Sequence, residues 1–335
     1  MFNVGAWSYT MRGSILSLFE LCCKVKQVSA KQISIIEVGP RDGLQSEPEI
    51  LSTETKLTFI NHAIDAGVRR MEVTSFVHPK RVPQMADAEA VVAGLPQRDD
   101  FIPIGLVLNK RGFERARDCG IAEIGMAVIA SETYNQRNNG TSTQGSIDAW
   151  LEMAAEAKQE GMRANVMVSS AFGCPFEGEV PLQHVLDIVK QIIEVEPVEL
   201  GFADSIGVGV PTQVTEMIGA VKEIAPDLSL RFHFHNTRNV GLANAMAAVE
   251  AGVDTLDASI GGIGGCPFAP AATGNIPTDD LLYMLHRSGV ETGVSLEKIV
   301  ATSHWLEEQL GRPTPAMLPK AGIFPQVAER YREAS

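Results

Sequence analysis

Cysteine is scarce in this sequence and follows no recognisable spacing. The 335 residues contain an odd number of cysteines, five, at Cys22, Cys23, Cys119, Cys174 and Cys266. A disulfide-stabilised domain would need paired cysteines at framework spacing, and this chain has no such pattern. A reducing compartment is therefore the simpler interpretation, and we expect a cytoplasmic protein.

The sequence also lacks long apolar runs and an excess of positive charge. No run of 18 or more apolar residues occurs, so we predict no membrane span. The formal net charge is −13, which argues against nucleic acid as a partner because such binding depends on basic patches. An anionic substrate would have to be met by local positive charge or by a metal ion.

The first 30 residues differ in character from the rest of the chain. Residues 14–25 are largely apolar but interrupted by Glu20, and the surrounding charges are mostly basic. A mitochondrial transit peptide has similar features, which makes the mitochondrial matrix the alternative location. We expect residues 1–30 to be an N-terminal extension and residues 31–335 to form a single catalytic domain with C-terminal helical additions.

From residue 33 onward, short β-rich runs alternate with helical patterns. The expected strands cover residues 33–38, 70–74, 102–108, 123–129, 164–169, 199–203, 230–235 and 255–259, and the expected helices cover residues 53–66, 83–95, 112–118, 147–160, 181–193, 211–224, 242–251 and 278–287. This series predicts an α/β fold, a parallel (β/α)8 TIM barrel with an extra C-terminal helix over residues 295–310. The alternative is a doubly wound open sheet, but residues 39–43 do not form its usual Gly-x-Gly-x-x-Gly loop.

One predicted strand carries two histidines on the same face. In residues 230–235, apolar side chains alternate with Arg231, His233 and His235, so the two imidazoles project together. Neutral imidazoles side by side form half of a divalent-metal site. The alternative is a pair of core histidines with hydrogen-bond partners, because unsatisfied polar groups are costly inside a protein.

In a (β/α)8 barrel the active site lies at the carboxyl ends of the strands, which makes polar residues there candidates. They are Arg41, Asp42, Glu72, Asp204, His233, His235 and Asn275. Asp42 and the two histidines offer one hard oxygen and two nitrogens, which suits Mg²⁺, Mn²⁺ or Zn²⁺, and Asn275 could add a carbonyl oxygen. Taken alone, Asp42 would be interpreted as a turn residue before Gly43.

Arg41 and Glu72 from this set, together with two thiols, could support such a site. Arg41 could hold a carboxylate or stabilise an enolate oxygen, and Glu72 could orient Arg41 or a metal-bound water. Cys266 follows four glycines in a loop that permits close approach to a ligand, so its thiol is a candidate acid, base or nucleophile. Cys174, in a similar Gly-Cys-Pro-Phe sequence, is the rival thiol.

Several separate segments resemble, in order, the motifs of hydroxymethylglutaryl-CoA lyases. They are residues 37–45 (Glu-Val-Gly-Pro-Arg-Asp-Gly-Leu-Gln), 74–80, 82–85, 173–178, 204–209, 264–269 and 273–275. The resemblance extends from about residue 33 to about residue 293 and is specific because many motifs match together. It implies a metal-dependent TIM-barrel enzyme, similar to isopropylmalate synthase, that acts on an acyl-CoA as a homodimer or larger homo-oligomer.

The resemblance also implies a reaction and residue roles. 3-Hydroxy-3-methylglutaryl-CoA would undergo retro-Claisen cleavage to acetoacetate and acetyl-CoA. Arg41 would stabilise the enolate, Cys266 would protonate its carbon, and Asp42 or a nearby histidine would take the hydroxyl proton. The ion, Mg²⁺ or Mn²⁺, would be held by Asp42, His233, His235 and Asn275.

Two positions depart from the family pattern, which often has an aspartate and an aromatic residue where this chain has Asn236 and Arg238. Arg238 could bind a different acid or a CoA phosphate, which leaves the exact substrate open. The alternatives are citramalyl-CoA, a longer 3-alkyl-3-hydroxyglutaryl-CoA, or a synthase reaction that condenses acetyl-CoA with a 2-oxo acid. A catalytically silent binding barrel is a further alternative, against which the complete set of candidate ligands argues.

Overall fold

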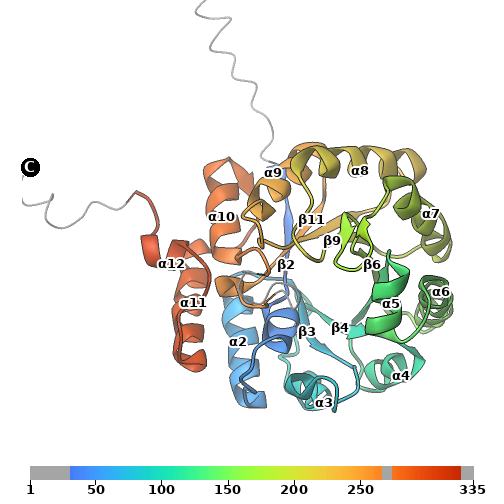
Figure 1. Cartoon of the computed structure of the whole chain (residues 1–335). Helices are drawn as coiled ribbons and strands as arrows, with labels where there is room; N and C mark the ends of the chain where they lie inside the picture. Colours follow the sequence, from blue (N-terminus) through green and yellow to red (C-terminus); the bar gives the residue numbers. More distant parts are fainter. Residues whose placement is uncertain (1–30, 266–273, 326–335) are drawn as a thin grey trace, which may run out of the picture. The chain divides into compact units, whose positions relative to one another are not determined.

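Eight parallel strands close into a barrel in the computed structural model, which describes residues 31–265 and 274–325 (Figure 1). The barrel strands are β2 (Ser34–Glu37), β3 (Arg70–Ser75), β4 (Ile102–Val107), β5 (Glu123–Ile129), β6 (Arg163–Ser169), β9 (Leu200–Asp204), β10 (Leu230–Phe234) and β11 (Thr255–Ala258). They follow one another around the ring in chain order, and β11 pairs with β2 to close it. The predicted TIM barrel is thereby confirmed.

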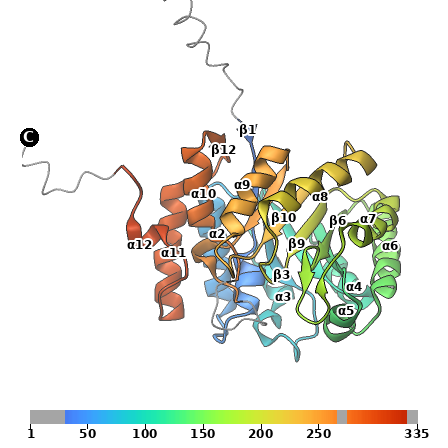
Figure 2. The ribbon, with the colours of Figure 1, turned by 45° about the horizontal axis from the view of Figure 1, so that its top comes forward.

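Helices surround the barrel on the outside (Figures 1 and 2). They are α2 (Thr53–Asp65), α3 (Ala88–Ala93), α4 (Lys110–Asp118), α5 (Glu132–Asn139), α6 (Thr143–Gln159), α7 (Leu182–Ile192), α8 (Pro211–Ile224), α9 (Gly241–Ala251), α10 (Thr278–Arg287), α11 (Leu296–Leu310) and α12 (Leu318–Ala321). The short strands are β1 (Lys31–Gln32), β7 (Gly173–Cys174), β8 (Gly178–Glu179) and β12 (Val290–Glu291). The predicted extra C-terminal helix is α11, which packs beside α2 through Phe59 and Trp305, with ring centroids 6.1 Å apart.

Three helical segments differ from the prediction, each for a local reason. The helix expected over residues 83–95 is a 3-10 turn, Pro83–Met85, followed by the shorter α3. Helix α6 begins before residue 147 because the Ser142 hydroxyl accepts a hydrogen bond from Gly145 N and caps it. Helix α5 was not predicted because its sequence is almost entirely polar, yet Ser131 caps its start and Gly140 ends it with a positive φ.

The inside of the barrel is charged, whereas the outer faces of the strands are apolar. On β10, the outward Phe232 and Phe234 stack with ring centroids 5.5 Å apart, and both belong to the main core shared with the helices. Inward residues form ion pairs across the barrel, such as Arg70 with Glu123 and Glu199. The small apolar cluster of Ile36, Val38 and Ile104 is separate from the main core. The barrel interior therefore uses side-chain charge where many barrels use branched apolar residues.

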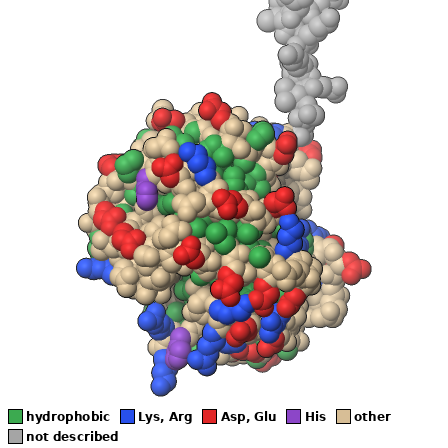
Figure 3. Space-filling view, turned by 90° about the vertical axis from the view of Figure 1, so that its right-hand side faces the viewer, with side chains coloured by type: hydrophobic (Ala, Val, Ile, Leu, Met, Phe, Trp, Pro, Cys, Tyr) green, Lys and Arg blue, Asp and Glu red, His purple; other side chains and the backbone are tan. Residues whose placement is uncertain are grey.

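The described surface agrees with the acidic composition. Basic side chains lie next to acidic ones on the face shown in Figure 3. Ion pairs such as Arg117 with Glu156 join α4 to α6. Within the described ranges, no helix combines the length and apolar character that crossing a membrane requires. The residues described from Gln32 onward belong to one compact unit, and the predicted division at residue 30 stays a prediction.

Candidate active site

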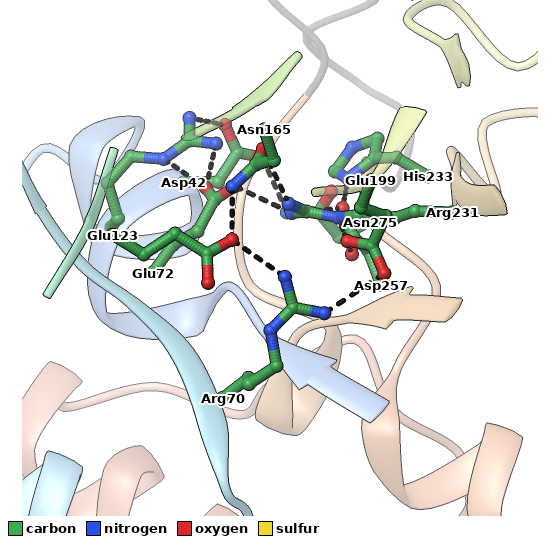
Figure 4. Close-up of polar contacts among 11 residues, drawn as sticks. Asp42, Arg70, Glu72, Glu123, Asn165, Glu199, Arg231, His233, Asp257 and Asn275 are labelled. Atoms are coloured by element: carbon green, nitrogen blue, oxygen red, sulfur yellow. Dashed lines mark hydrogen bonds and ion pairs between the residues drawn. The ribbon is translucent and has the colours of Figure 1, made fainter. Parts of the chain in front are cut away.

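The candidate site begins with the inward face of β10 and the residue directly after it. Arg231 and His233 on the strand and His235 just beyond it follow one another at two-residue spacing (Figure 4 labels Arg231 and His233). Strand geometry sends alternate side chains to the same face, so the three lie at successive depths along the barrel. The two imidazole rings have centroids 5.2 Å apart, and both residues are buried. The predicted same-face arrangement of the histidines is therefore present.

Asp42 reaches the site from η1 (Gly39–Gly43), the tight turn that follows β2. The carbonyl of Val38 accepts hydrogen bonds from the backbone amides of Arg41, Asp42 and Gly43, at 3.1, 2.7 and 3.2 Å. This turn brings the Asp42 carboxylate toward β10. One ligand atom each from Asp42, His233 and His235 lie within 4.8 Å of one another, which is the spacing of a shared ion.

Asn275 lies beside the end of β10, where it forms a backbone bridge with His235. Its Nδ2 donates to Asp42 Oδ2 at 2.9 Å and to the Ile263 carbonyl at 3.1 Å. Within the described residues, Asn275 Oδ1 and His235 Nδ1 are buried side-chain atoms with no hydrogen-bond partner. A buried polar atom without a partner is costly, and a bound cation would satisfy the amide oxygen and an imidazole lone pair. The donor set therefore fits a divalent ion.

Electrostatics keeps most of these groups in the form that binds metal. Burial raises the pKa of Asp42, but the charges of Arg41, His233 and His235 outweigh it, and the pKa lies well below its usual range. Burial and the neighbouring His233 lower the pKa of His235 to about 3, so its imidazole is neutral at pH 7. Burial lowers the pKa of His233, but its hydrogen bond to Asp257 and the charge of that residue raise it overall.

A chain of charged hydrogen bonds runs beneath the site (Figure 4). Arg41 Nη1 donates to Asp42 Oδ1 at 2.5 Å, and Arg41 Nε donates to Glu72 Oε2 at 2.6 Å. Glu72 Oε1 accepts from Arg231 Nη2 at 2.6 Å. His233 Nδ1 lies 3.1 Å from Asp257 Oδ2, which leaves its Nε2 for a ligand.

Two other predicted residues, one at the end of β9 and one on the loop after β10, bond the backbone of the loop after β9. Asp204 is buried, and its oxygens accept from the amides of Val208 and Gly209 at 2.9 and 2.8 Å. Arg238 is exposed, and its Nη1 donates to the carbonyls of Ile206 and Gly207 at 2.7 and 3.1 Å. Both side chains thus fasten this loop, and their predicted catalytic and substrate-binding roles stay predictions.

Of the two predicted thiols, Cys174 belongs to the described residues and Cys266 does not. Cys174 is buried, its Sγ lies 2.8 Å from Ser131 Oγ, and it accepts from the Phe176 amide at 3.3 Å. These contacts make it part of the packed loop around β7. Cys266 lies outside the described residues, which stop at Gly265 and resume at Gly274.

Sequence reasoning missed two members of this site, Arg231 and Asp257. Both were visible at inward positions of predicted strands, and a charge at such a position must find a partner inside the barrel. The contact between Arg231 and Asp257 depends on how β10 pairs with β11, because the register of that pairing places His233 beside Asp257. Contact between Arg231 and Glu72 joins residues far apart in the chain, which no local pattern specifies.

Comparisons with known proteins identify relatives of the whole barrel. Residues 32–306 match the family described as HMGL-like. The (R)-citramalyl-CoA lyase of Chloroflexus aurantiacus is 40% identical over 306 residues, covering 88% of this chain and 96% of that protein. The hydroxymethylglutaryl-CoA lyase of Bacillus subtilis is 39% identical, and the match covers 85% of this chain and 96% of that protein. The structure of an HMG-CoA lyase from Acinetobacter baumannii in complex with coenzyme A and 3-methylmalate superposes with a TM-score of 0.85 at 36% identity. The match covers 90% of this chain and 98% of that chain.

Proposed function

The chain belongs to the HMGL-like family and is a carbon–carbon lyase, and from this premise we propose that it cleaves 3-hydroxy-3-methylglutaryl-CoA to acetyl-CoA and acetoacetate with the help of Mg²⁺ or Mn²⁺. The observation that carries the proposal is the cluster of Asp42, His233 and His235, with Arg41 hydrogen-bonded to Asp42 beside it. One carboxylate and two imidazoles, with the Asn275 oxygen available, form a donor set suited to such an ion.

The proposed reaction breaks the bond between C2 and C3 of the acyl chain. The C3 hydroxyl loses its proton, and the electrons of the broken bond move to C2 and generate the enolate of acetyl-CoA. A bound divalent ion would supply Lewis acidity that lowers the pKa of the hydroxyl and orients it together with the distal carboxylate. Asp42 or His233 accepts the hydroxyl proton.

Arg41 is suited to stabilise the enolate oxygen. Its guanidinium is always charged, and its position is fixed from two sides by Asp42 and Glu72. Its side chain keeps 11% of its surface exposed, so the group is not fully enclosed. Donors held in place before the reaction cost no reorganisation when charge develops on the oxygen.

Cys266 is proposed to protonate the enolate carbon and release acetyl-CoA. The residues that lead up to it support this role, because Asn275 N donates to the Gly264 carbonyl at 3.2 Å and Asn275 Nδ2 donates to the Ile263 carbonyl. The described chain therefore contacts Asn275 at Gly264, two residues before the thiol in the sequence. We also retain Glu72, which orients Arg41, and Asp204 in the proposed catalytic set.

A specific observation favours (R)-citramalyl-CoA as a second candidate substrate. The citramalyl-CoA lyase relative is as similar to this chain as the hydroxymethylglutaryl-CoA lyase relative is. The two thioesters share the tertiary hydroxyl and the C2–C3 bond that breaks, and they differ by one methylene in the carboxylate arm. Citramalyl-CoA would yield pyruvate in place of acetoacetate. Arg238, on the loop after β10, is the proposed contact to the acid or to a CoA phosphate.

A thioester panel tests the proposal. Purified protein is incubated with 3-hydroxy-3-methylglutaryl-CoA, both citramalyl-CoA epimers and a 3-ethyl homologue, and acetyl-CoA, acetoacetate and pyruvate are quantified. We expect acetyl-CoA and acetoacetate in equal amounts from the first substrate. Pyruvate from a citramalyl-CoA with little acetoacetate would transfer the assignment to the second candidate, and no acetyl-CoA from any thioester would refute both.

Removal of the ion tests the metal assignment separately. Exhaustive chelation should abolish turnover, and Mg²⁺ or Mn²⁺ should restore it. Replacing a residue that only supports a metal ligand typically lowers activity by up to roughly 100-fold. Asp42 is a proposed ligand itself, so Asp42→Asn should lower turnover by at least that much. Full turnover in the chelated wild-type protein would contradict the metal assignment. Asp100→Asn, which alters an exposed ion pair with Arg98, is the matched control and should behave like the wild type.

The remaining expectations are part of the same proposal. We propose an acyl-CoA substrate, no nucleic-acid or membrane partner, and a homodimer or larger assembly in the cytoplasm, with the mitochondrial matrix as the alternative. The net charge of −13 supports the exclusion of nucleic acid as a partner. The coenzyme A complex of the A. baumannii relative supports the substrate class.

A further inference from the structure

Arg231 is a fully buried arginine directly below the two histidines of β10. Its side chain is 1% exposed, and it lies two residues before His233 on the same face of the strand. Nε and Nη2 donate to the two oxygens of Asp257 at 2.6 and 2.8 Å, and Nη2 also donates to Glu72 Oε1 at 2.6 Å. Nη1 lies 3.4 Å from Asn165 Oδ1.

The two carboxylates that Arg231 holds each have a second partner in the site. Glu72 uses its other oxygen, Oε2, to accept from Arg41 Nε at 2.6 Å. Asp257 uses Oδ2 to contact His233 Nδ1 at 3.1 Å. Arg231 therefore lies at the junction of one arm that leads to the proposed enolate-stabilising arginine and another that leads to a proposed ion ligand (Figure 4).

We propose that Arg231 is a positioning residue that fixes Arg41, through Glu72, and His233, through Asp257, as one rigid unit. The inference rests on the proposed function, because it assigns Arg231 to the geometry of the metal-dependent lyase site. Arg231 itself reaches neither the substrate nor the ion in this account. It determines where the groups that do reach them are held.

The physical argument starts from the cost of burying charge. A buried ion pair rarely adds stability over packed apolar side chains, so stability alone is a weak reason for an arginine here. The planar guanidinium has five donors in a fixed fork, and one such group can bind Asp257 through two hydrogen bonds while binding Glu72. A lysine ammonium is a point charge and cannot fix both carboxylates in this plane.

Without Arg231, Glu72 and Asp257 lose their shared countercharge. Among the described hydrogen bonds, each carboxylate then keeps its partner in the site, Arg41 or His233, but loses the guanidinium that ties the two pairs together. Outer partners of this kind typically change metal affinity or activity by about 10- to 100-fold when they are altered. Replacing Arg231 should therefore disturb the positions of Arg41 and His233 together.

The test compares Arg231→Lys and Arg231→Met with the matched control Arg70→Lys. Arg70 is also an inward arginine that bridges two carboxylates, Glu123 and Glu199, at 2.7 and 3.0 Å, but it contacts neither Glu72 nor Asp257 in the described hydrogen bonds. Three quantities are measured for each protein: the Mn²⁺ dissociation constant of the chelated protein by electron paramagnetic resonance, kcat and KM with Mn²⁺ at saturation, and the thermal midpoint.

We expect Arg231→Lys to weaken Mn²⁺ binding by about 10-fold and to lower kcat by about 10- to 100-fold, with KM changed by less than about 3-fold. Arg231→Met should lower the Mn²⁺ affinity and kcat further, because methionine keeps a similar side-chain volume but removes the positive charge. Arg70→Lys should lower the thermal midpoint without changing Mn²⁺ affinity or kcat. A purely structural role for Arg231 would make the two lysine variants behave alike.

Several outcomes would overturn the inference. Folded Arg231→Lys with wild-type Mn²⁺ affinity and kcat would do so, and so would losses in Arg70→Lys equal to those in Arg231→Lys. Failure of both Arg231 variants to fold would assign the residue to stability and would also reject the proposal. If wild-type protein cleaves no thioester, the proposed function fails by itself, and the Mn²⁺ affinities still decide the positioning role through His233.

Discussion

Cys174 and Cys266 share a Gly-Cys-Pro-Phe sequence, and of the two only Cys174 belongs to the described residues. Cys174 is enclosed and already interacts with Ser131 and with the Phe176 amide. A thiol with two protein partners has little freedom to deliver a proton to a substrate. The described residues Ile263 and Gly264, which precede Cys266 in the chain, contact Asn275, and we therefore keep Cys266 as the proposed proton donor for the enolate carbon.

We therefore expect Cys266→Ala to lower kcat by about 100- to 10,000-fold, the range that a general acid typically contributes, while KM changes little. Cys174→Ser is the matched control because a hydroxyl can keep both contacts of the thiol, and it should retain most of the activity. Steady-state acetyl-CoA release measures both variants. An unchanged turnover number in Cys266→Ala would remove Cys266 from the mechanism.

Two turns from opposite ends of the chain meet at the site. The turn η1 follows the first barrel strand, and the glycine-rich segment from Gly261 to Gly265 follows the last. Gly264 has a φ of +103°, and a Cβ there would lie 2.5 Å from Asn275 Nδ2 and 3.2 Å from Gly43 Cα. This glycine allows the two backbones to approach closely enough for Asn275 to bond Asp42.

Gly264→Ala should therefore displace Asn275 and weaken Mn²⁺ binding to the chelated protein. We expect a loss of about 10-fold or more, since an outer contact of a ligand is disturbed. Gly265→Ala is the matched control because a Cβ there meets no described atom within 4 Å and the backbone φ is not positive. Equal Mn²⁺ affinities for the two variants would contradict the close-approach argument.

The barrel as a whole was predictable because its signals are local and repeated. Alternating strand and helix patterns predicted the eight units, and the alternation around His233 and His235 predicted that both imidazoles lie on the same face of the strand. The charged layer beneath them was not predictable, because the contact of Arg231 with Glu72 depends on how strands on different sides of the ring face one another. The polar helix α5 was missed because its apolar periodicity is weak and its caps define it.

A buried carboxyl lies at the end of β2, close to where the ring closes. Glu37 is 0% exposed and accepts hydrogen bonds from Gly39 N, Ile260 N and Thr278 Oγ1, at 2.8, 2.9 and 2.7 Å. It thereby joins the first strand to the segments that follow the last strand. Burial raises the pKa of Glu37 to about 8, although hydrogen bonds from Thr278, Ile260 and Gly39 act in the opposite direction.

This pKa predicts that folding stability falls as pH rises. Below the unfolded pKa of 4.5 the carboxyl is protonated in both states, and its contribution is fully present. Between pH 4.5 and about 8 the unfolded chain releases the proton while the folded chain retains it, so the unfolded state gains relative stability. The loss from this group between pH 5 and 8 should be on the order of 3 kcal/mol.

Glu37→Gln should remove this slope, because the amide has no proton to release and can still accept from the two amides and donate to Thr278. Urea unfolding of chelated protein at pH 5, 6, 7 and 8 measures the difference between variant and wild type, which cancels the other titrating groups. Asp100→Asn is the control: its hydrogen bond with Arg98 lowers the pKa of Asp100 to about 2, so it stays ionised over this range and the slope should not change. Parallel curves for Glu37→Gln and wild type would show that the Glu37 carboxyl does not hold its proton in the closed barrel.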